Sequence, residues 1–173
     1  IRENMHIRRF KRLEGILVPY VHGGGKIGVM VNLETPAGAT DAVLACGKDC
    51  ALQVAALKAP YLKREDVPAN VLESEKKIML AQMDEDPKMA NKPEQVKAKI
   101  VEGKIGKYYS ENCLLDQEFV KDGSFTVQKY VDNCAKEANT TIKVVDYVCF
   151  ERGEGVEKKE DNFADEVASM MKK

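Results

Sequence analysis

The clearest pattern of hydrophobic and polar positions lies between Pro68 and Tyr109. Hydrophobic residues recur there at spacings of three, four and seven, as on one side of a helix. A polar run ending in Pro87 interrupts the pattern and Pro93 restarts it, so we predict two antiparallel helices with a tight polar tip. Such a hairpin is a packing or oligomerisation arm, and its apolar stripe comprises Val71, Leu72, Ile78, Met79 and Met83, then Val96, Ile100, Val101, Ile105 and Tyr108.

Shorter periodicities flank this hairpin. Residues 26–33 and 141–150 alternate as strands do, whereas residues 41–58 and the segment after Thr126 have helical spacing. Residues 5–20 are consistent with two short strands or with a strand and a bend. We predict a small α+β domain whose helices cover a sheet, with the helical arm protruding from it. The inward positions predicted for the first helix are Val43, Cys46, Gly47, Cys50, Val54 and Leu57, and those on one side of the last strand are Ile142, Val144, Val148 and Phe150.

Three glycines follow His22 and precede the strand that starts near Lys26. Glycines at successive positions let a backbone approach a partner closely. Gly25 and Lys26 suggest a phosphate-binding loop, but that motif requires glycine where Tyr20 stands and serine or threonine where Ile27 stands. The pattern therefore argues against nucleotide binding by this loop.

The C-terminal tail differs in kind from the rest of the chain. Gly153, Glu154 and Gly155 predict a flexible joint, and a charged run follows them. An apolar stripe then predicts a short amphipathic helix, made by Phe163, Val167, Met170 and Met171. Such a helix behind a glycine joint either docks on a partner or folds back on its own core, and periodicity alone leaves both alternatives open.

Composition narrows the class of protein. Twenty-seven basic residues stand against twenty-eight acidic ones, so no charge imbalance points to nucleic acid or to a membrane surface. The chain has no tryptophan, and no apolar window approaches the ~20 residues that a membrane span needs. No signal peptide is evident. The chain opens with Ile1 rather than methionine, so we expect a fragment.

Chemistry-bearing residues are sparse. The five cysteines are irregularly spaced, which is typical of reduced thiols in a cytosolic protein. Cys46 and Cys50 lack the further ligands that a metal site needs. The only histidines are His6 and His22, and no Ser, His and Asp grouping is evident. We therefore expect that the protein binds no metal ion and no cofactor, and that it is not an enzyme.

Several segments together resemble bacterial elongation factor Ts. They are IRENMHIRR at the start, HGGGKIGVMV from His22, REDVP from Arg64, KIVEGKIGKYY from Lys99, CLLDQEFVKD from Cys113 and FERGEGVEKKEDNFADEVAS from Phe150. In this order and at these separations they are specific. The resemblance covers essentially the whole chain but corresponds to the later part of that family's protein.

The resemblance implies a guanine nucleotide exchange factor that binds the GTPase elongation factor Tu in the cytoplasm, or in an organelle matrix or stroma. It implies a core of three antiparallel strands packed against helices from residues 1–62 and 112–152. Residues 63–111 would be a coiled-coil arm used for dimerisation in some members, with Val71, Leu72, Ile78, Met79, Val96, Ile100 and Val101 in its seam. Residues 153–173 would be the module that docks on the GTPase. The partner-binding residues implied are Ile1, His22, Gly23, Phe163, Val167 and Met170.

One characteristic family motif, Thr-Asp-Phe-Val, is absent from this sequence. In the family it belongs to the first half of the core, so this chain alone is expected to bind weakly and to exchange nucleotide poorly. The alternative function is a structural or oligomerisation module without exchange activity of its own.

Overall fold

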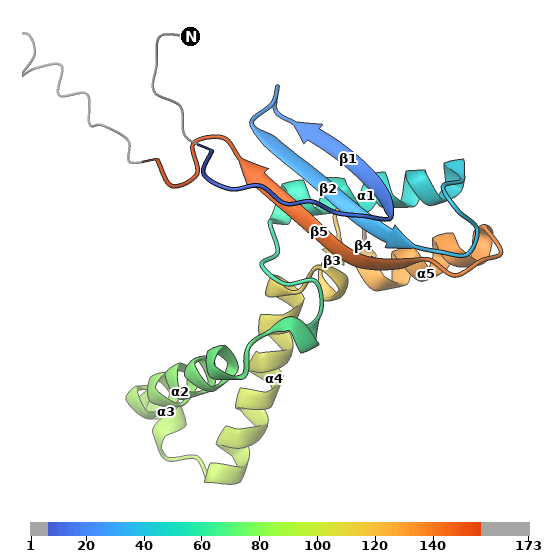
Figure 1. Ribbon diagram of the computed structural model, residues 1–173. Coiled ribbons are helices and arrows are strands. Elements are labelled where there is room, and N and C mark those ends of the chain that lie inside the picture. Colours follow the sequence, from blue (N-terminus) through green and yellow to red (C-terminus); the bar gives the residue numbers. More distant parts are fainter. Residues whose placement is uncertain (1–6, 157–173) are drawn as a thin grey trace, which may run out of the picture.

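The computed structural model describes residues 7–156, which form an α+β fold built on a three-stranded antiparallel sheet (Figure 1). The strand order is β1-β2-β5, and β2 pairs with both neighbours. The predicted fold class is confirmed, although its C-terminal helix lies outside the described residues. The strands span Ile16–His22 (β1), Ile27–Glu34 (β2) and Lys143–Glu151 (β5).

Two helices, α1 (Asp41–Leu57) and α5 (Val127–Glu137), cover one face of this sheet. Each begins where predicted, because the hydroxyl oxygens of Thr40 and Thr126 accept hydrogen bonds from backbone amides of the first turn. Val43, Cys46, Gly47, Cys50 and Val54 are buried as expected. Leu57 was predicted to be buried and is 51% exposed, because it is the last residue of α1 and its side chain lines an open hollow with Lys107 and Gln117 near the base of the hairpin.

The other face of the sheet is crossed by the segment that precedes β1 (dark blue in Figure 1). Lys11 pairs with Asp146 at 2.6 Å, and the Asn32 amide donates to the Glu14 carbonyl at 3.0 Å. Residues 7–14 contain no strand, so a strand and a bend describe this region and two strands do not. This segment contacts the sheet through side chains such as Lys11 and does not form a fourth strand.

A β-bulge changes which residues of β5 face the core. Asn32 pairs with Asp146 but Leu33 pairs with Val144, so Val145 is an extra residue. An extra residue reverses the side to which later side chains point. Ile142 and Val144 are buried as predicted, but beyond the bulge Tyr147 and Cys149 pack on the core instead of the predicted residues Val148 and Phe150.

The helical hairpin projects from the core (Figure 1). Its two connections to the core are held together, because the Leu114 amide donates to the Tyr61 carbonyl at 2.9 Å and Arg64 Nε donates to Asp116 at 2.8 Å. The polar tip, predicted as a plain interruption, contains a one-turn helix that the Asp86 side chain caps. The helices are α2 (Ala69–Glu85), α3 (Pro87–Ala90) and α4 (Glu94–Asn112).

A short second hairpin follows α4 and returns the chain to the core. Strands β3 (Glu118–Phe119) and β4 (Asp122–Thr126) pair across a turn at Val120 and Lys121, two positions earlier than the predicted Asp122–Gly123 turn. The Phe119 ring stacks on the Tyr130 ring with centroids 4.1 Å apart. This stack joins the small sheet to α5.

Candidate functional site

The loop between β1 and β2 is formed by Gly23, Gly24, Gly25 and Lys26. The three glycines have φ values of +60°, +62° and +86°, a conformation that other residues rarely adopt. The Lys26 amide closes the loop by donating to the His22 carbonyl at 3.1 Å. A side chain built on Gly24 or Gly25 would meet no atom within 4 Å, so the loop stands clear of the rest of the protein. The predicted glycine loop and strand are confirmed.

His22 is the last residue of β1 and is exposed at the base of this loop. The Tyr20 hydroxyl lies 3.0 Å from its Nδ1 atom. The two rings are tilted by 35° with centroids 6.0 Å apart. Tyr20 is half-buried and packs on the core, so an anchored side chain supports an exposed imidazole.

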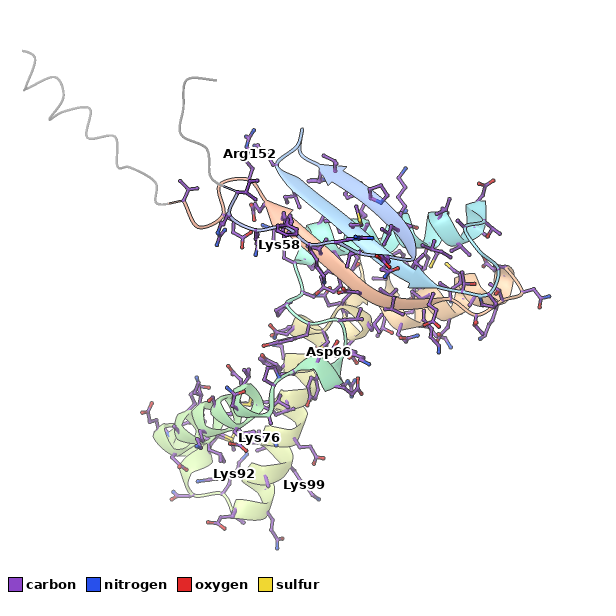
Figure 2. The ribbon with its side chains drawn as sticks, viewed as in Figure 1. Lys58, Asp66, Lys76, Lys92, Lys99 and Arg152 are labelled. Atoms are coloured by element: carbon purple, nitrogen blue, oxygen red, sulfur yellow. The ribbon has the colours of Figure 1, made fainter. Side chains whose placement is uncertain are left out.

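Both ends of the described chain lie at the same end of the sheet as His22. Ile27 pairs with Glu151, and the Arg152 amide donates to the Lys26 carbonyl at 2.7 Å. Figure 2 shows Lys58 and Arg152 in this region, where Lys58 pairs with Glu151. The predicted joint at Gly153–Gly155 is a hydrogen-bonded turn whose Glu154 pairs with Arg9. The tail therefore starts close to the glycine loop.

The hairpin has a small apolar seam of its own. Met83, Val101 and Ile105 are buried in it, and Leu72, Met79 and Ile100 pack against them. Of the other residues assigned to the dimerisation seam, Val71 is half-buried, Ile78 is 50% exposed and Val96 is 40% exposed. The apolar side chains of the seam are therefore only partly buried by contacts within one chain.

A groove of about 700 Å³ lies between α2 and α4. Its apolar lining includes Leu80, Ala98 and Ile105, and Lys97 pairs with Asp84 at 2.5 Å on its wall. Lys76 lines this groove, whereas Lys99 lies on the outer side of α4 (Figure 2). Apolar surface with both charge signs at its edges is compatible with a helix of similar composition.

Sequence patterns did not reveal the buried polar contact at the base of the hairpin. The Gln53 side chain is fully buried, and its Nε2 atom donates to Gln117 Oε1 at 3.1 Å and to the Glu118 carbonyl at 3.0 Å. Its Oε1 atom accepts from the Val120 amide at 2.8 Å. Only the unusual placement of a glutamine on the apolar face of α1 could have signalled this contact.

The cysteines offer little reactivity. Burial raises the pKa of the Cys113 thiol to about 11 and that of the Cys134 thiol to about 11, so both are protonated at neutral pH. Cys46 and Cys50 are buried. Among residues 7–156 no group of three or more His, Cys, Asp or Glu side chains could hold a metal ion. No helix within that range is both long and apolar enough to cross a bilayer.

Comparison with known proteins decides the family. The family model described as Elongation factor TS matches residues 1–154. This chain belongs to the elongation factor Ts family. The predicted family is confirmed, and the loop that carries His22 and the hairpin both lie within the matched residues.

Individual elongation factor Ts proteins match over almost the whole chain. That of Syntrophotalea carbinolica is 45% identical, over 99% of this chain and 56% of the relative. Those of Clostridium kluyveri and Clostridium tetani are 42% and 44% identical, over 98% of this chain and 55% of each relative. The chain thus spans about half the length of these elongation factor Ts relatives.

The structure brings together only some of the partner-binding residues that the family resemblance implies. His22 and Gly23 are adjacent in the exposed loop. Ile1, Phe163, Val167 and Met170 lie outside the described residues. Of the partner-binding residues implied by the family, the structure therefore describes only those in the glycine loop and at its base.

Proposed function

We propose that this chain binds elongation factor Tu and promotes release of GDP from it, as part of an elongation factor Ts acting in the cytoplasm. The observation that supports this most directly is family membership together with an exposed His22 held on a rigid strand. We assign residues 1–62 and 112–152 to the core, 63–111 to the arm and 153–173 to a docking module. His22 and Gly23 would contact the GTPase, with Ile1, Phe163, Val167 and Met170 as further anchors.

The mechanism follows from thermodynamic linkage. A GTPase holds its nucleotide through backbone amides around the phosphates and through a magnesium ion. A factor that binds better when this hold is loosened must weaken nucleotide binding by the same factor by which nucleotide weakens its own binding. No covalent step is required. A rigid contact surface serves this purpose, because the binding energy is then available to displace the GTPase loops rather than to order the factor itself.

His22→Ala in the full-length product of this gene is expected to slow GDP release from elongation factor Tu about fivefold, at factor concentrations below saturation. A hydrogen bond from an exposed, pre-oriented side chain to its partner contributes about 1 kcal/mol, which corresponds to a factor of about five. The measurement is stopped-flow release of fluorescent GDP. Deletion of residues 153–173, measured alongside, should clearly lower the affinity for elongation factor Tu while changing the melting temperature of the protein only slightly.

Lys99→Ala is the matched control, because Lys99 lies on the hairpin, away from the glycine loop (Figure 2). It should leave the exchange rate unchanged. Wild-type kinetics for His22→Ala would remove this residue from the site. A full-length protein that does not accelerate release at any concentration would refute the proposed function.

The groove between α2 and α4 favours a second candidate function, self-association through the hairpin. A homodimer formed there would cover Leu80, which is 39% exposed and lines the groove. We expect the mass of this 19.3 kDa chain in sedimentation equilibrium to rise with concentration, and Leu80→Glu to abolish the rise. The Lys99→Ala variant should still associate. A chain that stays monomeric throughout the concentration series contradicts this candidate.

A further inference from the structure

We propose that Tyr20 is a positioning residue for His22: its hydroxyl donates to Nδ1, so that the imidazole presents an Nε2–H donor to an acceptor oxygen of the partner. This inference rests on the proposed function, because it assigns the chemistry of the same contact. The 3.0 Å separation between the Tyr20 hydroxyl and Nδ1 carries it. No comparison or sequence pattern assigns a role to Tyr20.

The position of Tyr20 on the sheet explains why its hydroxyl can orient the imidazole of His22. Tyr20 and His22 are two positions apart on β1, so their side chains lie on the same side of the sheet. Tyr20 pairs with Val29, which is buried, and His22 pairs with Ile27 at the end of the sheet. Tyr20 is therefore packed against the core while its hydroxyl reaches the exposed ring.

The direction of the hydrogen bond sets the tautomer. In a neutral imidazole one ring nitrogen is a donor and the other an acceptor. A phenol is a stronger donor than a neutral imidazole N–H, and the unprotonated ring nitrogen is a stronger acceptor than a phenol oxygen. Among the described residues, the Tyr20 hydroxyl has no hydrogen-bond partner other than His22. Its proton therefore points at Nδ1, and the ring proton is on Nε2.

The partner group facing His22 follows from this assignment. An Nε2–H donor fits a backbone carbonyl, an amide oxygen or a carboxylate, and it does not fit an ammonium or another donor. The adjacent glycine loop leaves room for such a group, since nothing lies within 4 Å of a side chain built on Gly24 or Gly25. A fixed ring also binds with less loss of side-chain freedom than a rotating one.

Tyr20→Phe tests the inference, because it keeps the packed ring and removes only the hydroxyl. Nitrogen-15 spectra of the imidazoles at about pH 8, where an ordinary imidazole is neutral, report the tautomer, and χ1 couplings report whether the ring is fixed. His22→Ala identifies the His22 signals, since His6 is the only other histidine. We expect a single rotamer with the proton on Nε2 in the wild-type chain, and averaged χ1 couplings with a mixture of tautomers in Tyr20→Phe.

Binding to nucleotide-free elongation factor Tu separates the possible failures. Tyr20→Phe should weaken binding about threefold, and the double variant should bind no more weakly than His22→Ala, because Tyr20 acts through His22. If His22→Ala weakens binding while Tyr20→Phe binds as wild type, the inference alone is wrong. If His22→Ala has no effect, the proposed contact is wrong, whatever the spectra show. A proton on Nδ1, or spectra that Tyr20→Phe leaves unchanged, also overturns the inference.

Discussion

Gln53→Met is expected to lower the free energy of unfolding by about 3 kcal/mol, because it leaves several polar groups at the base of the hairpin without partners. Methionine preserves the volume of the side chain but cannot replace the hydrogen bonds of the amide. Gln117 Oε1, the Glu118 carbonyl and the Val120 amide would each lose a partner. Gln117 is only 2% exposed, so water cannot readily replace the lost donor.

Thermal unfolding followed by circular dichroism measures this effect as a melting temperature lower by about 6–12 °C. The matched control is Gln95→Met, since Gln95 is exposed in the first turn of α4. It should change the free energy of unfolding by no more than about 0.5 kcal/mol. Hydrogen exchange should accelerate first at residues 117–120. Equal stability of the two variants would show that the Gln53 contacts contribute little.

Gly47→Ala is expected to destabilise the protein by about 1–3 kcal/mol, although alanine is the better helix former. Gly47 is a buried residue of α1 that faces β1 and β2. A Cβ atom there would lie 2.6 Å from Val18 Cγ2 and 2.8 Å from Leu33 Cδ1. Val18 and Leu33 are themselves buried, so relief requires moving the helix away from the sheet.

Gly106→Ala provides a control with the opposite expected sign. Gly106 lies in α4, is exposed, and has nothing within 4 Å of a built Cβ atom. The same substitution there should stabilise the protein by about 1 kcal/mol through helix propensity alone. Urea unfolding of both variants measures the difference. Stabilisation by Gly47→Ala would mean that the sheet face accommodates a methyl group without cost.

Long, strongly periodic segments were predictable from the sequence. The hydroxyls of Thr40 and Thr126 mark where their helices begin, and Pro87 and Pro93 bound the tip of the hairpin. These signals are local, because caps and prolines act on backbone groups within one helical turn. The predicted family rested on segments spread along the whole chain, and it was confirmed by a match to residues 1–154.

Predictions failed where a non-local contact decided the outcome. The alternation of residues 141–150 was extrapolated across the bulge at Val145, which exists only because β2 and β5 shift register there. Leu57 has the helical spacing of a core residue, but α1 ends there and the side chain lines an open hollow with Lys107 and Gln117. The sequence left open whether the seam of the hairpin packs within one chain or on a second copy; Leu72, Met79, Ile100 and Val101 pack together within one chain, and dimerisation through the hairpin stays a prediction.

The sequence by itself determined the α+β class, the two-helix arm and the glycine loop after His22, because each depends on residue types at short, regular spacings. It also determined the family, through segments that occur in a fixed order along the whole chain. Only the tertiary structure decided that Tyr20 supports His22, that Gln53 joins α1 to the base of the hairpin, and that the tail begins at the His22 end of the sheet. The physical reason is that single side-chain contacts depend on strand register and helix packing, which bring distant residues to within a few ångströms and leave no periodic pattern along the chain.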